Sequence, residues 1–129
     1  MASFSLTQTL RKKAPLGLFR RFGVMKVAAL GEAYELSVVI VGKKRMRTLN
    51  RTTRGKDYTT DILSFPLDKT AGEIVINLDA CKKKAREFDR TFENYLDFLF
   101  IHGLVHLLGF DHGSKMESKE RAVRQQFGV

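Results

Sequence analysis

All three histidines of this chain lie within the eleven residues from His102 to His112, and this cluster constrains the fold more than any other feature. His106 follows His102 by four positions, so on a helix both side chains project from one face and can bind one ion. Gly109 is a natural helix terminator, and a turn there can bring His112 to the same ion. The segment is therefore expected to end a helix at a metal site.

Three neutral imidazoles predict a metal centre in which zinc is favoured, with nickel, copper or iron as further options by ligand type. A tetrahedral ion with three protein ligands keeps one position for a water molecule. Zinc can ionise this water near neutral pH, and the ion can also polarise a phosphoryl or carbonyl oxygen. Asp111 could orient an imidazole, assist proton transfer, or only form a turn. The alternative for the whole segment is that the histidines merely complete a buried helix.

The length of 129 residues predicts one domain, residues 1–129, with one core and one site. Cys81 is the sole cysteine, so no internal disulfide can form and a reducing, cytoplasmic location is expected. Residues 1–10 lack the pattern of an export signal, and the apolar run over 22–30 is too short and too interrupted to span a bilayer. No membrane association is expected.

Positive charge is concentrated in the first half of the chain. The net charge is +9, and residues 1–60 hold thirteen Lys and Arg against three acids, whereas residues 61–129 hold ten against eleven. Basic clusters attract polyanions, so together they favour nucleic-acid binding over a merely solvating surface. The two clusters are Arg11, Lys12, Lys13, Arg20, Arg21 and Lys26, and Lys43, Lys44, Arg45, Arg47, Arg51, Arg54 and Lys56.

Hydrophobic periodicity predicts short strands mixed with helices. The expected strands are 4–8, 34–41, 61–66 and 72–77, the last two as a hairpin, and the expected helices are 14–30, 43–51, 78–88, 91–108 and 115–126. The helix over 91–108 is apolar around most of its circumference and should be buried, with Thr91 as its N-cap. Ser114 and Glu117 predict a capping box for the last helix, and residues 51–58 a loop.

One class of zinc proteases reads H-E-x-x-H-x-x-G-x-x-H, and this chain matches that pattern at each histidine and at Gly109. Gly103 stands where those enzymes carry the glutamate that serves as general base. Peptide hydrolysis is therefore disfavoured. Cleavage of phosphodiesters fits better, because the basic clusters can bind a phosphate backbone.

The run from His102 to His112 resembles the signature of the YbeY family, the bacterial metal-dependent endoribonucleases of ribosomal RNA maturation. A second segment agrees with this resemblance. The family's arginine loop and T-D-V-L-S-F-P strand resemble Leu49-Asn50, Arg54-Gly55-Lys56-Asp57 and Thr60-Asp61-Ile62-Leu63-Ser64-Phe65-Pro66. Gly72-Glu73-Ile74 resembles its G-D-I strand start. The family usually has proline where this chain has Thr59, a change expected to loosen the loop that carries Arg54.

The resemblance implies an α+β domain. Its small, mixed and mostly antiparallel sheet would pack against about five helices, with a metal cleft at the end of the central buried helix. One zinc ion, or another divalent metal, would be held there by His102, His106 and His112. Arg54 would line the cleft as a catalytic residue that grips a phosphate. The RNA-binding residues are expected to be Arg45, Arg47, Arg51, Arg54 and Lys56.

The expected function is that of a single-strand-specific, zinc-dependent endoribonuclease in maturation of the 3′ end of small-subunit ribosomal RNA and in ribosome quality control. Attack by metal-bound hydroxide and attack by the 2′-OH both remain open, and a 2′,3′-cyclic phosphate product would identify the second. Implied partners are ribosomal RNA, the small ribosomal subunit, one of its proteins and an assembly GTPase. The alternatives are a ribosome assembly or binding factor with a structural zinc, and a metallohydrolase of another substrate.

Overall fold

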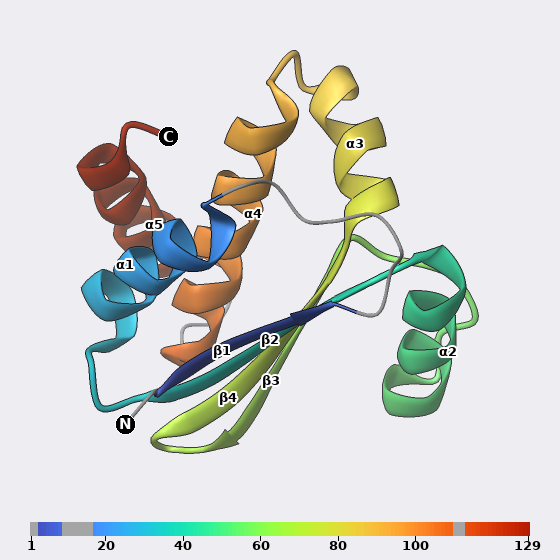
Figure 1. The fold of residues 1–129 in the computed structure, drawn as a ribbon, viewed down its shortest axis with the longest axis horizontal. Helices are drawn as coiled ribbons and strands as arrows, with labels where there is room; N and C mark the ends of the chain where they lie inside the picture. Colours follow the sequence, from blue (N-terminus) through green and yellow to red (C-terminus); the bar gives the residue numbers. More distant parts are fainter. Residues whose placement is uncertain (1–2, 9–16, 110–112) are drawn as a thin grey trace.

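The structure is a computed structural model that describes residues 3–8, 17–109 and 113–129. Within these residues it contains a four-stranded mixed sheet and five helices, which confirms the expected α+β class (Figure 1). The elements in chain order are β1 (Phe4–Gln8), α1 (Leu18–Leu30), β2 (Glu35–Val41), α2 (Lys43–Arg54), β3 (Ile62–Asp68), β4 (Ala71–Asn77), α3 (Leu78–Glu87), α4 (Phe92–Leu107) and α5 (Ser114–Phe127).

The strand order across the sheet is β1-β2-β4-β3. β1 pairs with β2 and β2 with β4 in parallel, whereas β3 and β4 form the expected antiparallel hairpin. The expectation of a mostly antiparallel sheet is therefore wrong. The physical reason lies in the connections: α1 carries the chain from β1 back to the start of β2, and the segment of α2 and β3 does the same between β2 and β4.

Both faces of the sheet are covered by helices. Along β4, the side chains of Ile74 and Ile76 join the main core, while Val75 between them joins a second cluster with Met46 of α2. This alternation follows from the period of two along a strand. Because the main core also contains residues of α1, α3, α4 and α5, those helices pack on one face and α2 packs on the other. Figure 1 shows α2 apart from the group of α1, α4 and α5.

Helix α4 is the centre of the main core. Phe100 and Leu104 are fully buried, and the Phe100 ring stacks on Phe22 of α1 with ring centroids 3.8 Å apart. The Thr91 side chain accepts a hydrogen bond from the Asn94 amide (3.1 Å), which confirms the expected N-cap. None of the helices within 17–109 and 113–129 is long and apolar enough to cross a bilayer.

Some boundaries differ from those expected, each for a local reason. Helix α1 begins at Leu18, and residues 14–16 of the predicted helix lie outside the described residues. The prediction that Ser114 caps the last helix is wrong, because α5 already begins at Ser114 and Gly113 precedes it. β3 continues through Pro66, where its register against β4 shifts. An edge strand tolerates a proline because the missing N–H faces away from the ladder.

Cys81 lies fully buried on α3, and its environment changes its acidity. Burial, reinforced by the charge of Asp61, raises the pKa of the Cys81 thiol from 9.0 to about 12. Burial likewise raises the pKa of Tyr95, whose hydroxyl donates to Asp61 Oδ2 (3.1 Å). Between pH 9 and 12 the folded protein keeps the thiol proton that the unfolded chain releases. The free energy of unfolding therefore falls as the pH rises through this window.

Urea unfolding at pH 8 and pH 10 tests this effect. The parent protein is expected to lose about 1 kcal/mol more unfolding free energy between the two pH values than Cys81→Ala, which has no thiol to titrate. The variant is compared with itself at the two pH values, so the cost of the smaller side chain cancels. Equal losses in parent and variant would show that the thiol is not held protonated by the fold.

Candidate active site

A pocket of about 400 Å³ opens where the end of α2, strand β3 and the last turns of α4 meet. It brings together three of the residues singled out in the sequence: Arg54, the last residue of α2, and His102 and His106, one turn apart on α4. The other lining residues are Thr53, Ile62, Leu63, Ser64 and Phe65. A cation and two imidazoles from elements distant in the sequence therefore share one concave site.

The two described histidines can serve as metal ligands. Imidazole donors at this spacing suit zinc and other borderline divalent metals. His112 and Asp111 lie outside the described residues, so the third ligand and the role of Asp111 stay predictions. Within 3–8, 17–109 and 113–129, no group of three or more His, Cys, Asp or Glu side chains gathers at metal-binding distance. The described part of the site thus offers two imidazoles that could bind a metal.

His102 has a carboxylate partner that the sequence analysis did not name. Its Nδ1 lies 3.2 Å from Oε2 of Glu120 on α5. No local pattern links two residues on separate helices, so spacing around His102 could not reveal this contact. The available signal was the position of Glu120, four residues after the buried Met116 and three before the buried Val123, which puts it on the inward face of α5.

The comparison with known families decides how this pocket is interpreted. The family model described as Endoribonuclease YbeY matches residues 18–128. The chain belongs to the YbeY family. It is 39% identical over 104 residues to the endoribonuclease YbeY of Alkaliphilus metalliredigens, with 72% of this chain and 67% of that protein covered. It is 42% identical over 106 residues to the endoribonuclease YbeY of an Anaeromyxobacter species, covering 77% of this chain and 55% of that protein, so it spans little more than half that relative's length.

A solved structure supports the same fold. The solution structure of TM1509 from Thermotoga maritima matches with a TM-score of 0.72 and 27% sequence identity, covering 97% of this chain and 89% of that one. The four-stranded sheet and its helices are thus an arrangement already seen by experiment in another protein. The similarity extends over nearly the whole length of this YbeY-family chain.

Packing explains the glycine in the YbeY-family histidine segment. A Cβ atom on Gly103 would lie 2.8 Å from Ile62 Cδ1, 3.1 Å from Ser64 Oγ and 3.2 Å from Ile74 Cδ1. A side chain at this position would enter the contact between α4 and the β3–β4 hairpin. A protease-type glutamate at position 103 would have to displace the side chains of Ile62 and Ile74, and with glycine in its place the pocket has no general base from this position.

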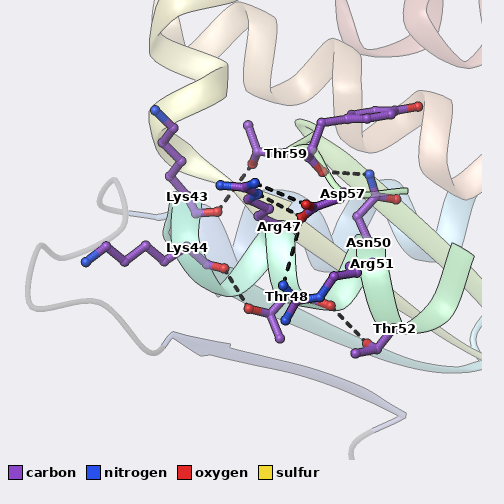
Figure 2. Close-up of polar contacts among 10 residues, drawn as sticks. Lys43, Lys44, Arg47, Thr48, Asn50, Arg51, Thr52, Asp57 and Thr59 are labelled. Atoms are coloured by element: carbon purple, nitrogen blue, oxygen red, sulfur yellow. Dashed lines mark hydrogen bonds and ion pairs between the residues drawn. The ribbon is translucent and has the colours of Figure 1, made fainter. Parts of the chain in front are cut away.

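Arg54 is held by a helix, and the expectation that a loop over 51–58 carries it is wrong. Helix α2 continues to Arg54 because Gly55, with φ of 69°, is the residue that ends it. The following loop is tied down: buried Asn50 donates to the Tyr58 carbonyl (2.8 Å), and the Thr59 hydroxyl donates to the Lys43 carbonyl (3.3 Å) (Figure 2).

The Thr59 hydroxyl also accepts from Asn77 Nδ2 (3.1 Å). Asn77 in addition caps α3, since its Oδ1 accepts from the amides of Asp79 and Ala80. One asparagine thus joins this YbeY-family loop to the start of α3. Threonine in place of the family's usual proline is therefore anchored by two hydrogen bonds, contrary to the expectation that it would loosen the loop.

The cations of α2 are not all equivalent. Figure 2 shows Arg47 and Arg51 directed at Asp57: Arg47 Nε and Nη2 lie 3.0 and 3.2 Å from its two carboxylate oxygens, and Arg51 Nη1 lies 3.9 Å from Oδ1. The hydrogen bond and charge of Arg47 lower the pKa of the Asp57 carboxyl. Arg45 and Lys56 are exposed, and the Lys56 ammonium lies 5.9 Å from the centre of the Tyr58 ring.

The described basic residues of the first cluster do not form one exposed surface. Lys26 is only 1% exposed and donates to Ser3 Oγ (3.0 Å) and to the Glu32 carbonyl (2.8 Å). Burial lowers its pKa, and the nearby Glu32 carboxylate opposes that shift. Arg21 Nε donates to Asp97 Oδ1 (2.7 Å). The expectation of nucleic-acid binding is wrong for Lys26, and residues 11–13 of the cluster lie outside the described residues.

Substitutions at Gly103 test the close contact beneath the pocket. Gly103→Ala is expected to lower the free energy of unfolding, because overpacking costs about 1–3 kcal/mol and exceeds the roughly 1 kcal/mol that alanine gains inside a helix. Gly103→Val should lower it further. Urea unfolding of the three proteins measures the order. A Gly103→Ala protein more stable than the parent would show that α4 and the hairpin have room to spare.

Proposed function

We propose that this chain is a metal-dependent endoribonuclease that cuts single-stranded RNA in the pocket formed by α2, β3 and α4. The observation that carries the proposal is the convergence of Arg54 with His102 and His106 in one cavity. Its membership of a family whose model is described as an endoribonuclease supports the substrate class. The strongly cationic helix α2 at the pocket rim supplies the charge that RNA binding requires.

Each residue has a role that follows from its chemistry. The Arg54 guanidinium can donate to two oxygens of the scissile phosphate and stabilise the negative charge that develops in the transition state. His102 and His106, with His112, would hold one divalent metal, and zinc is the ion this donor set favours. When bound, such a metal supplies Lewis-acid stabilisation and an activated water. Asp111 is proposed to orient an imidazole or to assist proton transfer.

The RNA strand is proposed to follow α2 away from the pocket. Arg47 and Arg51 lie on the same face of α2 as Arg54, whereas Arg45 lies on the opposite face. These three residues and Lys56 are exposed and are proposed to contact the strand. The contacts of Arg47 and Arg51 with Asp57 do not prevent this, because exposed ion pairs are weak and a phosphate can take the place of the carboxylate. A single strand also has a flexible backbone that can enter the pocket, whereas a duplex is rigid.

The biological setting is proposed from the family resemblance. The substrate would be ribosomal RNA at the 3′ end of the small subunit, in the cytoplasm, and cleavage would serve maturation and quality control of ribosomes. The small ribosomal subunit, one of its proteins and an assembly GTPase are the proposed partners. Residues 1–129 would act as a single domain.

Cleavage of a labelled single-stranded RNA by zinc-loaded protein tests the proposal. Arg54→Ala is expected to lower the rate about 100-fold or more, the usual cost of removing one donor that stabilises the transition state. Arg54→Lys should recover only part of the rate, because an ammonium cannot grip two oxygens at once. His106→Ala should abolish cleavage. Arg86→Ala removes the same charge from the exposed surface of α3 and should cut like the parent.

The outcomes separate the alternatives. If the parent and all variants cut alike, the nuclease is a contaminant. If the folded parent binds RNA but cuts none, a ribosome-binding factor with a structural metal becomes the better description, and removing zinc should then unfold the protein. Circular dichroism of every variant confirms that a lost activity is not a lost fold.

Removing the acid that binds the arginines of α2 tests the RNA path. Asp57→Asn is expected to bind single-stranded RNA several-fold tighter than the parent at low salt, because Arg47 and Arg51 lose a competing anion. Its affinity should also fall more steeply with added salt. Fluorescence anisotropy at two salt concentrations measures both effects. Glu35→Gln removes an exposed acid from the start of β2 and serves as the control; an equal gain in this variant would mean that only net charge matters.

A further inference from the structure

His102 stands between two cavities. One is the proposed catalytic pocket, and the other, also of about 400 Å³, lies on the α5 side and is lined by residues that include Met116, Glu117 and Glu120. The imidazole faces Glu120 through Nδ1, at 3.2 Å from Oε2. The Glu120 side chain is 12% exposed and that of His102 is 32% exposed, so this contact is largely shielded from water.

The position of Glu120 is unusual for a carboxylate. It lies on the face of α5 that carries Met116 and Val123 into the core, and glutamate is seldom placed there without a partner. Glu117, one turn earlier, lines the same cavity but is exposed to solvent. The helix therefore presents two carboxylates to one cavity, and the less exposed one, Glu120, contacts the imidazole.

The contact has a consequence for the ring. A neutral imidazole carries one N–H, and a carboxylate that accepts a hydrogen bond from Nδ1–H selects the tautomer whose lone pair is on Nε2. Nε2 is then the atom that can coordinate a metal. A hydrogen bond of this kind also fixes the ring about its Cβ–Cγ bond.

We propose that Glu120 is a positioning residue for the metal site: its carboxylate holds His102 as the Nδ1–H tautomer, so that Nε2 is the atom that would bind a divalent cation. The inference rests on the proposed function only in taking His102 as a ligand. It gives α5 a role in the site that does not depend on the position of Asp111. It also makes the affinity for metal depend on how α5 packs against α4.

The tautomer can be measured without metal and without RNA. The chain has only three histidines, so long-range ¹H–¹⁵N spectra of the metal-free protein contain three imidazole spin systems, and His102→Ala assigns one of them. The parent and Glu117→Ala are expected to show His102 as the Nδ1–H tautomer, whereas Glu120→Ala should shift it toward the Nε2–H form. An Nε2–H tautomer in the parent overturns the proposal, even if Glu120→Ala does not fold.

Zinc affinity gives the second readout, by competition with a chromophoric chelator. Glu120→Ala is expected to bind zinc about 10–100-fold more weakly than the parent, the usual effect of losing such a partner. Glu120→Gln should fall between them, because its amide carbonyl can still accept from Nδ1–H. Glu117→Ala removes the same charge from the same cavity and should stay close to the parent.

The possible results lead to different conclusions. Equal weakening by Glu117→Ala and Glu120→Ala would mean that only negative charge matters, and the positioning role would be wrong. Unchanged affinity in Glu120→Ala would overturn it as well. A parent that binds no zinc at all would contradict both this inference and the proposed metal site. A parent that binds zinc but cuts no RNA would contradict only the proposed nuclease activity.

Discussion

The close approach of α4 to the β3–β4 hairpin at Gly103 is the contact on which the candidate site depends. Because a Cβ atom there would lie 2.8 Å from Ile62 Cδ1, any larger residue at this position would have to displace side chains of β3 and β4. His102 and His106 flank that point, so their distance from the β3 wall of the pocket is set by backbone packing. The same contact brings the imidazoles into one pocket with residues of β3.

The site is assembled from both sides of the sheet. The histidines lie on α4, which packs in the main core, whereas Arg54 comes from α2, which covers the other face through Met46. The two layers meet at β3, the edge strand, and the hydrogen bonds of Asn50 and Asn77 hold the connecting loop in place. Neither layer contains the pocket by itself, so the relative placement of α2 and α4 on the sheet determines whether a phosphate could contact Arg54 and the imidazoles together.

The sequence predicts well what is decided locally. The strands and helices, the Thr91 cap and the spacing of His102 and His106 all follow from short-range periodicity and chemistry. Features that depend on packing between distant segments could not be obtained in this way: the parallel strand pairs, the burial of Lys26 and the contact of Glu120 with His102. The end of α2 at Arg54 could have been predicted from the sequence, since Gly55 is a local signal for the end of a helix. His112 and Asp111 lie outside the described residues, so the sequence alone supports their roles.

The proline in β3 has a consequence for behaviour in a crowded cell. An open sheet edge is a template on which a strand of another molecule can pair, and this is a common route to aggregation. Pro66 lacks an amide hydrogen, and the register shift beside Asp68 distorts the end of the strand. The run Ile62–Phe65 precedes the proline, and it is the run that lines the pocket. The edge of β3 beside the pocket thus offers little length for self-association.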